Sequence, residues 1–238
     1  MVPIEAFRFD PAASVTEIAV GAAPLLVIDG VFADPEMARS TARLLPAPLP
    51  HLSDFYPGLR FPVPDDFHQA FVDWLNGLSA TSSLLAGKQA VSERNAYVSV
   101  VTKPAFELLP IQTIPHFDTT DDQVFAAVIY LFETGFGGTS FYRHRSTGLQ
   151  CLTPQAEPLY RAALRREVAD PSAVPRRYRN GGDALFQRIH RQEPRFNRMI
   201  LYPGRALHAG DIDPDFAGAA GLVDGRLTIA ALCRLIPR

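Results

Sequence analysis

The stretch "IPHFDTTDDQVFAAVIYLFE" (residues 114–133) joins a His-x-Asp pair to a long apolar run. The run is rich in Val, Ile, Phe and Tyr, which favours a buried β-strand. Side chains alternate along a strand, so His116 and Asp118 project from one face if the strand begins at Ile114. An imidazole and a carboxylate side by side can share one metal ion. A motif this short also arises by chance, and a polar turn leading into a strand is the alternative.

Further runs of the same texture lie on both sides of this stretch, each bounded by Gly or Pro. With residues 123–133, they are residues 95–102, 139–148, 196–204 and 226–235. A charged segment at about 153–192 interrupts them and predicts one or two helices inserted into the sheet region. We therefore expect residues 94–238 to form a β core, either a sandwich or a barrel.

The first 93 residues predict a support for that core. Residues 24–32 have the pattern of a buried strand. Helices are expected at 34–45, with Asp34 as N-cap and Pro35 in the first turn, and at 65–78. The proline-rich segment 46–64 between them is not expected to hold regular structure, although it could cover a site. A chain of 238 residues suits one mainly β domain of the α+β kind, covering 1–238.

The composition narrows the class of protein. With 47% hydrophobic and 20% charged residues the chain has the profile of a soluble globular protein. A net charge of −2 gives no basic surface for nucleic acid. The N-terminus lacks the pattern of a secretory signal, and the apolar run at 19–28 is too short to span a membrane. The only two cysteines, Cys151 and Cys233, exclude a zinc-type cysteine cluster, and Cys233 is expected as a buried thiol. These features predict a cytoplasmic protein without nucleic-acid or membrane partners.

A third metal ligand would have to come from another strand. His208 follows the run at 196–204 and could complete a set of two imidazoles and one carboxylate with His116 and Asp118. Such a set on one face of an octahedron leaves three positions open, which is the pattern of non-haem Fe(II) oxygenases. Zinc prefers a closed tetrahedral set with more His or Cys. Taken alone, His208 could also be an ordinary loop histidine.

The last apolar run, residues 226–235, begins with a positively charged residue. Arg226 precedes "LTIAAL", where a lone guanidinium needs a partner or a path to solvent. Thr228 lies two residues on, hence on the same strand face. Together they could hold a carboxylate through a bidentate fork and a hydroxyl hydrogen bond. An edge-strand arginine on the surface is the alternative.

The order His-x-Asp, His, Arg-x-Thr resembles the Fe(II)/2-oxoglutarate-dependent dioxygenase superfamily, and within it the prolyl 4-hydroxylase-like branch. The segments "VIYLFE" (128–133) and "GFGGTSFYRH" (135–144) are similar to two strands of that branch, and "APLLVIDGVFADPEMARS" (23–40) to its N-terminal strand and helix. The resemblance implies a double-stranded β-helix, or jelly roll. It also implies Fe(II), with 2-oxoglutarate and O2 as co-substrates, and places Tyr130 where a hydroxyl helps to hold the far carboxylate of 2-oxoglutarate.

The function implied is hydroxylation of an amino acid, a peptide or a peptidyl side chain, with release of succinate and CO2. Because related halogenases lack the carboxylate of the metal set, the resemblance together with Asp118 implies hydroxylation and not halogenation. Tyr97, Arg60 and Arg143 are candidates for contacts to the substrate or around the metal. A metal hydrolase would need a general base near the metal. Glu133 is the only acid close by on the Tyr130 strand, and its odd spacing from Tyr130 is expected to turn it to the other face. Further alternatives are a jelly-roll protein that binds a metal or ligand without turnover and an interaction scaffold.

Overall fold

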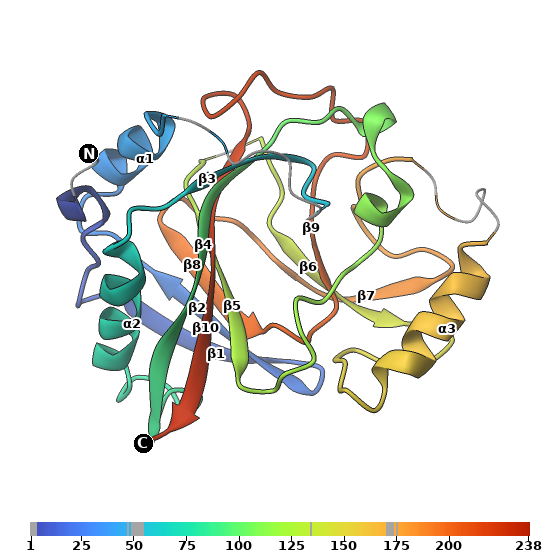
Figure 1. The fold of residues 1–238 in the computed structure, drawn as a ribbon, viewed down its shortest axis with the longest axis horizontal. Coiled ribbons are helices and arrows are strands. Elements are labelled where there is room, and N and C mark those ends of the chain that lie inside the picture. Colours follow the sequence, from blue (N-terminus) through green and yellow to red (C-terminus); the bar gives the residue numbers. More distant parts are fainter. Residues whose placement is uncertain (1–3, 47, 49–54, 134, 170–173, 175) are drawn as a thin grey trace.

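The protein is built around two antiparallel sheets. The structure, a computed structural model, describes residues 4–46, 48, 55–133, 135–169, 174 and 176–238. Within these ranges the larger sheet has seven strands in the order β1-β2-β8-β5-β10-β4-β3 and the smaller has three in the order β7-β6-β9. The larger sheet comprises β1 (Ser14–Val20), β2 (Ala23–Asp29), β8 (Arg198–Pro203), β5 (Val124–Tyr130), β10 (Arg226–Pro237), β4 (Lys88–Val101) and β3 (Gly58–Pro62). The smaller comprises β7 (Phe186–Gln192), β6 (Thr139–His144) and β9 (His208–Gly210). The expectation of a mainly β fold with few helices is confirmed (Figure 1).

Helices cover the outer face of the larger sheet. They are α1 (Pro35–Arg43), α2 (Phe67–Gly77) and the 3-10 helix η1 (Ile4–Phe7), whereas α3 (Glu157–Glu167) lies beside the smaller sheet (Figure 1). Two further 3-10 helices, η2 (Ala105–Glu107) and η3 (Pro110–Thr113), precede the His-x-Asp pair. None of the helices in the described ranges is long and apolar enough to cross a membrane.

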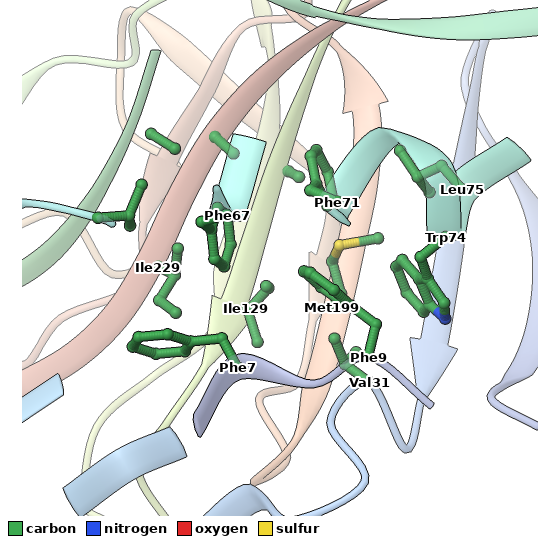
Figure 2. Packing of buried hydrophobic residues seen from close by; sticks show 14 of the residues in the cluster. Phe7, Phe9, Val31, Phe67, Phe71, Trp74, Leu75, Ile129, Met199 and Ile229 are labelled. Carbon is green, nitrogen blue, oxygen red and sulfur yellow. The ribbon is translucent and has the colours of Figure 1, made fainter. Parts of the chain in front are cut away.

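The main core lies between α2 and the larger sheet. Phe67, Phe71 and Trp74 of α2 are buried against aromatic rings of the N-terminal segment, with Phe9 stacked on Trp74 at 4.9 Å between ring centroids. Figure 2 shows these rings facing strand residues such as Ile229. Residues before and after position 94 therefore share one core, and β4 itself runs across that position.

The opposite face of the larger sheet meets the smaller sheet. There the aromatic residues Tyr130, Phe141 and Tyr202 pack together, and the rings of Phe141 and Tyr202 meet edge to face at 5.0 Å. Residues paired directly across β10 and its neighbours point to the same side, so alternate positions of each strand face either the helices or the smaller sheet.

Several sequence predictions are confirmed. The strand expected at 24–32 is β2, and the helices expected at 34–45 and 65–78 are α1 and α2. The Asp34 carboxylate accepts a hydrogen bond from the backbone N–H of Met37 at 2.9 Å, as an N-cap should. The thiol of Cys233 is buried and forms no disulfide.

Three predictions were wrong in part. Within the segment 46–64, of which residues 47 and 49–54 lie outside the described residues, Gly58–Pro62 form β3. Only glycine fits at 58, because a Cβ there would lie 1.9 Å from the carbonyl oxygen of Val100. In the described part of the segment 153–192, which leaves out residues 170–173 and 175, the helix α3 is followed by a strand, β7, whose residues are too polar to show a strand pattern. The strand after the His-x-Asp pair begins at Val124, so His116 and Asp118 are not part of it.

Replacing Phe67 with Ala should lower the free energy of unfolding by about 3–5 kcal/mol, because it removes a fully buried ring and leaves a cavity. Phe106→Ala is the matched control: Phe106 is 72% exposed, so its loss should change stability by no more than about 0.5 kcal/mol. Denaturant unfolding followed by the fluorescence of Trp74 and by far-UV circular dichroism measures both. The two signals should coincide if 1–238 is one cooperative domain. Equal losses in the two variants, or separate transitions, would contradict this description.

Candidate metal centre

His116 and Asp118 lie in the loop between η3 and β5, and backbone hydrogen bonds fasten this loop to the segment that ends in His208. His116 and His208 exchange two bonds, at 2.9 and 2.8 Å between N and O. The N–H of Asp118 donates to the carbonyl of Gly204 at 2.7 Å. An isolated strand-like bridge, and not one continuous strand, therefore brings together ligands that are 92 residues apart.

The three side chains converge on one point. One oxygen of Asp118 lies 3.8 Å from Nε2 of His116, and the other lies 3.8 Å from Nε2 of His208. All three candidate ligand atoms lie within 4.8 Å of one another, and no other such group occurs among the residues that the structure describes. Ligands bonded to one ion at about 2.1 Å lie about 3–4 Å apart. The side chains need only a small closure to hold a metal.

The surroundings of His208 and His116 favour metal binding by their imidazoles. Nδ1–H of His208 donates a hydrogen bond to the carbonyl oxygen of Ala206 at 2.9 Å, which leaves the lone pair on Nε2, the nitrogen that lies nearest Asp118. His116 has 58% of its side chain open to a cavity, with protein around the rest of the ring. Desolvation by the protein packed against the ring and the neighbouring imidazole of His208 lower the pKa of His116. A neutral imidazole is the form that binds metal.

A cavity of about 290 Å³ opens beside the three side chains. Its floor is the inner face of the larger sheet, where Tyr97, Ala230 and Val128 stand side by side on β4, β10 and β5. Thr139 of the smaller sheet contributes to the opposite wall. The candidate metal position is thus at the edge of a space large enough for small molecules or a side chain.

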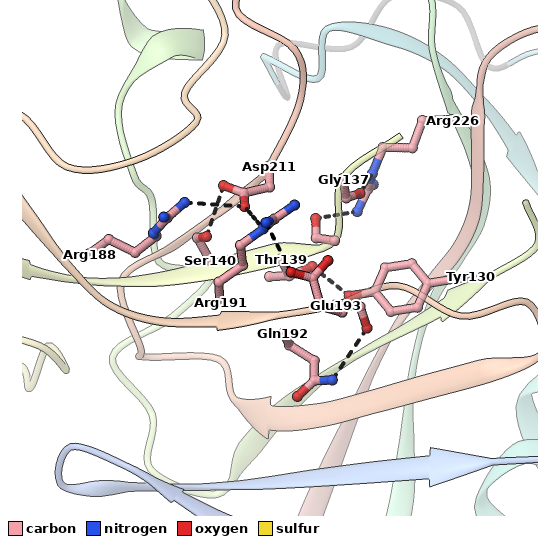
Figure 3. Close-up of polar contacts among 11 residues, drawn as sticks. Tyr130, Gly137, Thr139, Ser140, Arg188, Arg191, Gln192, Glu193, Asp211 and Arg226 are labelled. Atoms are coloured by element: carbon pink, nitrogen blue, oxygen red, sulfur yellow. Dashed lines mark hydrogen bonds and ion pairs between the residues drawn. The ribbon is translucent and has the colours of Figure 1, made fainter. Parts of the chain in front are cut away.

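Arg226 and Thr228 line this cavity from the start of β10. The guanidinium of Arg226 is buried and donates from Nε to the carbonyl of Gly137 at 2.9 Å and from Nη2 to that of Gly138 at 2.8 Å (Figure 3). Its central carbon lies 5.6 Å from the centre of the Tyr130 ring. The surface-arginine alternative is therefore excluded for Arg226.

Tyr130 stands opposite Thr228 on β5 but does not line the cavity itself. Its hydroxyl lies 2.9 Å from Oγ1 of Thr139, and this threonine faces the space. Burial raises the pKa of Tyr130, so the phenol keeps its proton. Sequence reasoning missed Thr139. The preceding Gly137-Gly138 pair was the available signal, since it marks a strand whose start is approached closely by other backbone.

Of the other residues that the sequence suggested for the site, some line the cavity and some do not. Arg60 and Tyr97 line the cavity, with the Arg60 guanidinium carbon 5.4 Å from the centre of the Tyr97 ring. Arg143 is not among the described residues that line the cavity, and its guanidinium lies beside the side-chain amide of Gln150. Glu133 is 61% exposed and forms an ion pair with Arg39 of α1 at 3.1 Å, away from the metal position.

Comparison with solved structures found remote likenesses. The non-heme alpha ketoglutarate dependent epimerase SnoN from nogalamycin biosynthesis is 14% identical, with 88% of this chain and 78% of that chain covered and a TM-score of 0.46. The N-substituted L-amino acid dioxygenase from Burkholderia ambifaria AMMD is 12% identical, with 94% and 98% covered and a TM-score of 0.42. Likenesses this remote do not carry an activity from one protein to another.

A search of the curated proteins found no relative of this sequence. The family described as "Family of unknown function (DUF6445)" matches residues 10–233, which is nearly the whole chain. The chain belongs to this family.

Proposed function

We propose that the protein is a non-haem Fe(II)- and 2-oxoglutarate-dependent dioxygenase of the prolyl 4-hydroxylase-like kind, built on a double-stranded β-helix. It would hydroxylate an amino acid, a peptide or a peptidyl side chain, converting 2-oxoglutarate and O2 to succinate and CO2. One observation carries the proposal. His116, Asp118 and His208 adjoin a cavity whose wall also holds the buried cation Arg226.

The donor set fits iron. Two imidazole nitrogens and one carboxylate oxygen form the facial triad of non-haem Fe(II) sites, which leaves positions open toward the cavity. A structural zinc site would need a fourth protein ligand, and the described residues offer none to this group. When bound, Fe(II) supplies the activation of dioxygen, which protein side chains cannot perform.

The polar wall fits a dicarboxylate co-substrate. Arg226 and Thr228 would bind the carboxylate far from the metal, and Tyr130 would act through Thr139, to which its hydroxyl is bonded. Thr228 also contacts the carbonyl of Ser99 at 3.4 Å, so its position is set by β4. These residues orient the co-substrate and keep its charged end away from water.

The remaining wall would hold the substrate. Tyr97 and Arg60 lie on the side of β3 and β4, where Tyr97 offers an aromatic face and Arg60 a positive charge. Asp118 is the only acid among the described residues that line the cavity, and it belongs to the metal set. Glu133 is paired with Arg39, so the described residues around the cavity offer no general base apart from the metal set. This weighs against a metal hydrolase.

Loss of any metal ligand should abolish stoichiometric iron binding. We expect about one Fe(II) per chain in the anaerobically loaded protein and a large loss in His116→Ala, Asp118→Ala and His208→Ala, because three ligands hold the ion. His190→Ala is the control, since His190 lies on β7 outside the cluster. Metal content after desalting measures the effect. Wild-type iron content in all three variants would refute the metal centre.

Arg226→Ala should weaken 2-oxoglutarate by roughly 30- to several-thousand-fold, since removing one partner of a buried charged pair costs about 2–5 kcal/mol. Arg226→Lys should recover part of the affinity, because a charge remains although the planar fork is lost. Iron affinity should stay unchanged. The absorption band of the anaerobic Fe(II) protein, titrated with 2-oxoglutarate, measures this, with Arg143→Ala as control. The same affinity in wild type and both Arg226 variants would remove the co-substrate assignment.

Catalysis itself distinguishes an oxygenase from a protein that only binds the same groups. In air, Fe(II)-loaded wild type should form succinate from 2-oxoglutarate, and a panel of amino acids and peptides should stimulate the rate. Asp118→Ala should form none. A protein that binds iron and 2-oxoglutarate but forms no succinate with any member of the panel would instead support the non-catalytic alternative.

A further inference from the structure

A buried carboxylate close to the site has no part in the proposed chemistry. Asp211 follows β9 directly, three residues after His208, and is completely buried. It accepts a hydrogen bond from Oγ of Ser140 at 2.8 Å and forms an ion pair with Nε of Arg191 at 2.6 Å (Figure 3). Arg188 lies 3.5 Å away. A buried charge is costly unless it is paired, so these contacts hold Asp211 in one place.

The arrangement of Arg226 determines how a ligand can approach it. A guanidinium has five N–H donors on a rigid fork. The edge formed by Nε and Nη2 is taken by the carbonyls of Gly137 and Gly138. The end of the fork, formed by Nη1 and the second N–H of Nη2, remains for a carboxylate in the cavity. The direction of this end depends on where the two carbonyls stand.

Asp211 contacts both glycines. Its N–H donates to the carbonyl of Gly138 at 3.0 Å, so this oxygen serves Asp211 and Arg226 together. Gly137 lies so close that a Cβ on it would be 1.9 Å from the carbonyl oxygen of Asp211. Moreover, β9 pairs with β6, which places His208 opposite Phe141. A shift of Asp211 would therefore move the Gly138 carbonyl that Arg226 contacts, whereas it would affect His208 only along the β9 strand.

We infer that Asp211 is a positioning residue for the co-substrate, which fixes the Gly137–Gly138 carbonyls so that the free end of the Arg226 fork faces the cavity. This inference rests on the proposed function. Ser140 and Arg191 act with Asp211, because they tie its carboxylate to β6 and β7. The role would explain why a carboxylate is buried beside a site that binds an anion.

The sign of the effect separates this role from a simple charge effect. The negative charge of Asp211 repels an incoming carboxylate. If it acted only through its charge, Asp211→Asn would tighten 2-oxoglutarate binding. If it positions Arg226, the same variant weakens binding, because the neutral amide holds Ser140 and Arg191 less firmly and the two carbonyls lose their fixed place.

The experiment is a double-mutant cycle on the anaerobic Fe(II) protein, titrated with 2-oxoglutarate. Asp211→Asn should weaken 2-oxoglutarate about tenfold in the wild-type background, as expected for residues in one network, and by less than about twofold in the Arg226→Gln background. Iron affinity should be unchanged in both. Ser140→Ala, which alters no charge, should weaken 2-oxoglutarate in the same direction. Glu167→Gln is the matched control, since Glu167 at the end of α3 pairs with His144 of β6, away from Asp211.

The outcomes are distinct. Tighter or unchanged binding in Asp211→Asn, or the same loss in both backgrounds, would overturn the inference while leaving the proposed function intact. An equal loss in Glu167→Gln, or a parallel loss of iron, would show a general effect on the sheet and also overturn it. A wild-type protein that binds neither iron nor 2-oxoglutarate would instead refute the proposed function, and the inference with it.

Discussion

The register of β10 is the constraint on which both the core and the site depend. Leu227 and Ile229 face the helix-covered core, while Arg226 and Thr228 face the cavity. Because side chains alternate along a strand, a slip of one residue would exchange the two sets. It would bury an unpaired guanidinium among aromatic rings and expose the apolar residues. The packing of α2 on one face therefore also secures the polar groups on the other.

The candidate metal centre is held by backbone as much as by side chains. The bridge between His116 and His208 fixes two of the ligands relative to each other, and the hydrogen bond from the N–H of Asp118 to the carbonyl of Gly204 places the third. Backbone hydrogen bonds allow only a narrow range of distances and angles, so they fix the positions of the ligand residues whatever side chains lie around them. Three ligands from two segments can thus converge although neither segment is a regular strand throughout.

Three buried polar side chains between the sheets are paired with polar partners. Arg226 bonds to two carbonyls, Tyr130 to Thr139, and Asp211 to a hydroxyl and a guanidinium. Buried polar groups cost free energy unless they are paired, and a fully paired network specifies one arrangement. The smaller sheet, with few strands and a polar outer strand in β7, gains its fixed position against the larger sheet from such contacts together with the packing of Phe141.

Local patterns in the sequence were enough for the parts whose causes are local. The apolar runs determined the buried strands, and Asp34 with Pro35 determined the start of α1 through hydrogen bonding and a fixed backbone angle. The residue types at His116, Asp118, His208 and Arg226 indicated metal and carboxylate chemistry. The edge strands β3 and β7 gave no such pattern, because edge positions tolerate proline and polar residues.

Only the tertiary structure decided which of these residues meet. It brought His116 to His208, left Arg143 outside the cavity that Arg60 lines, and placed Asp211 at the Gly138 carbonyl that Arg226 also contacts. Each outcome depends on pairing between strands that are distant in the chain. Such pairing is set by the burial of whole faces, and no short window of sequence contains that information.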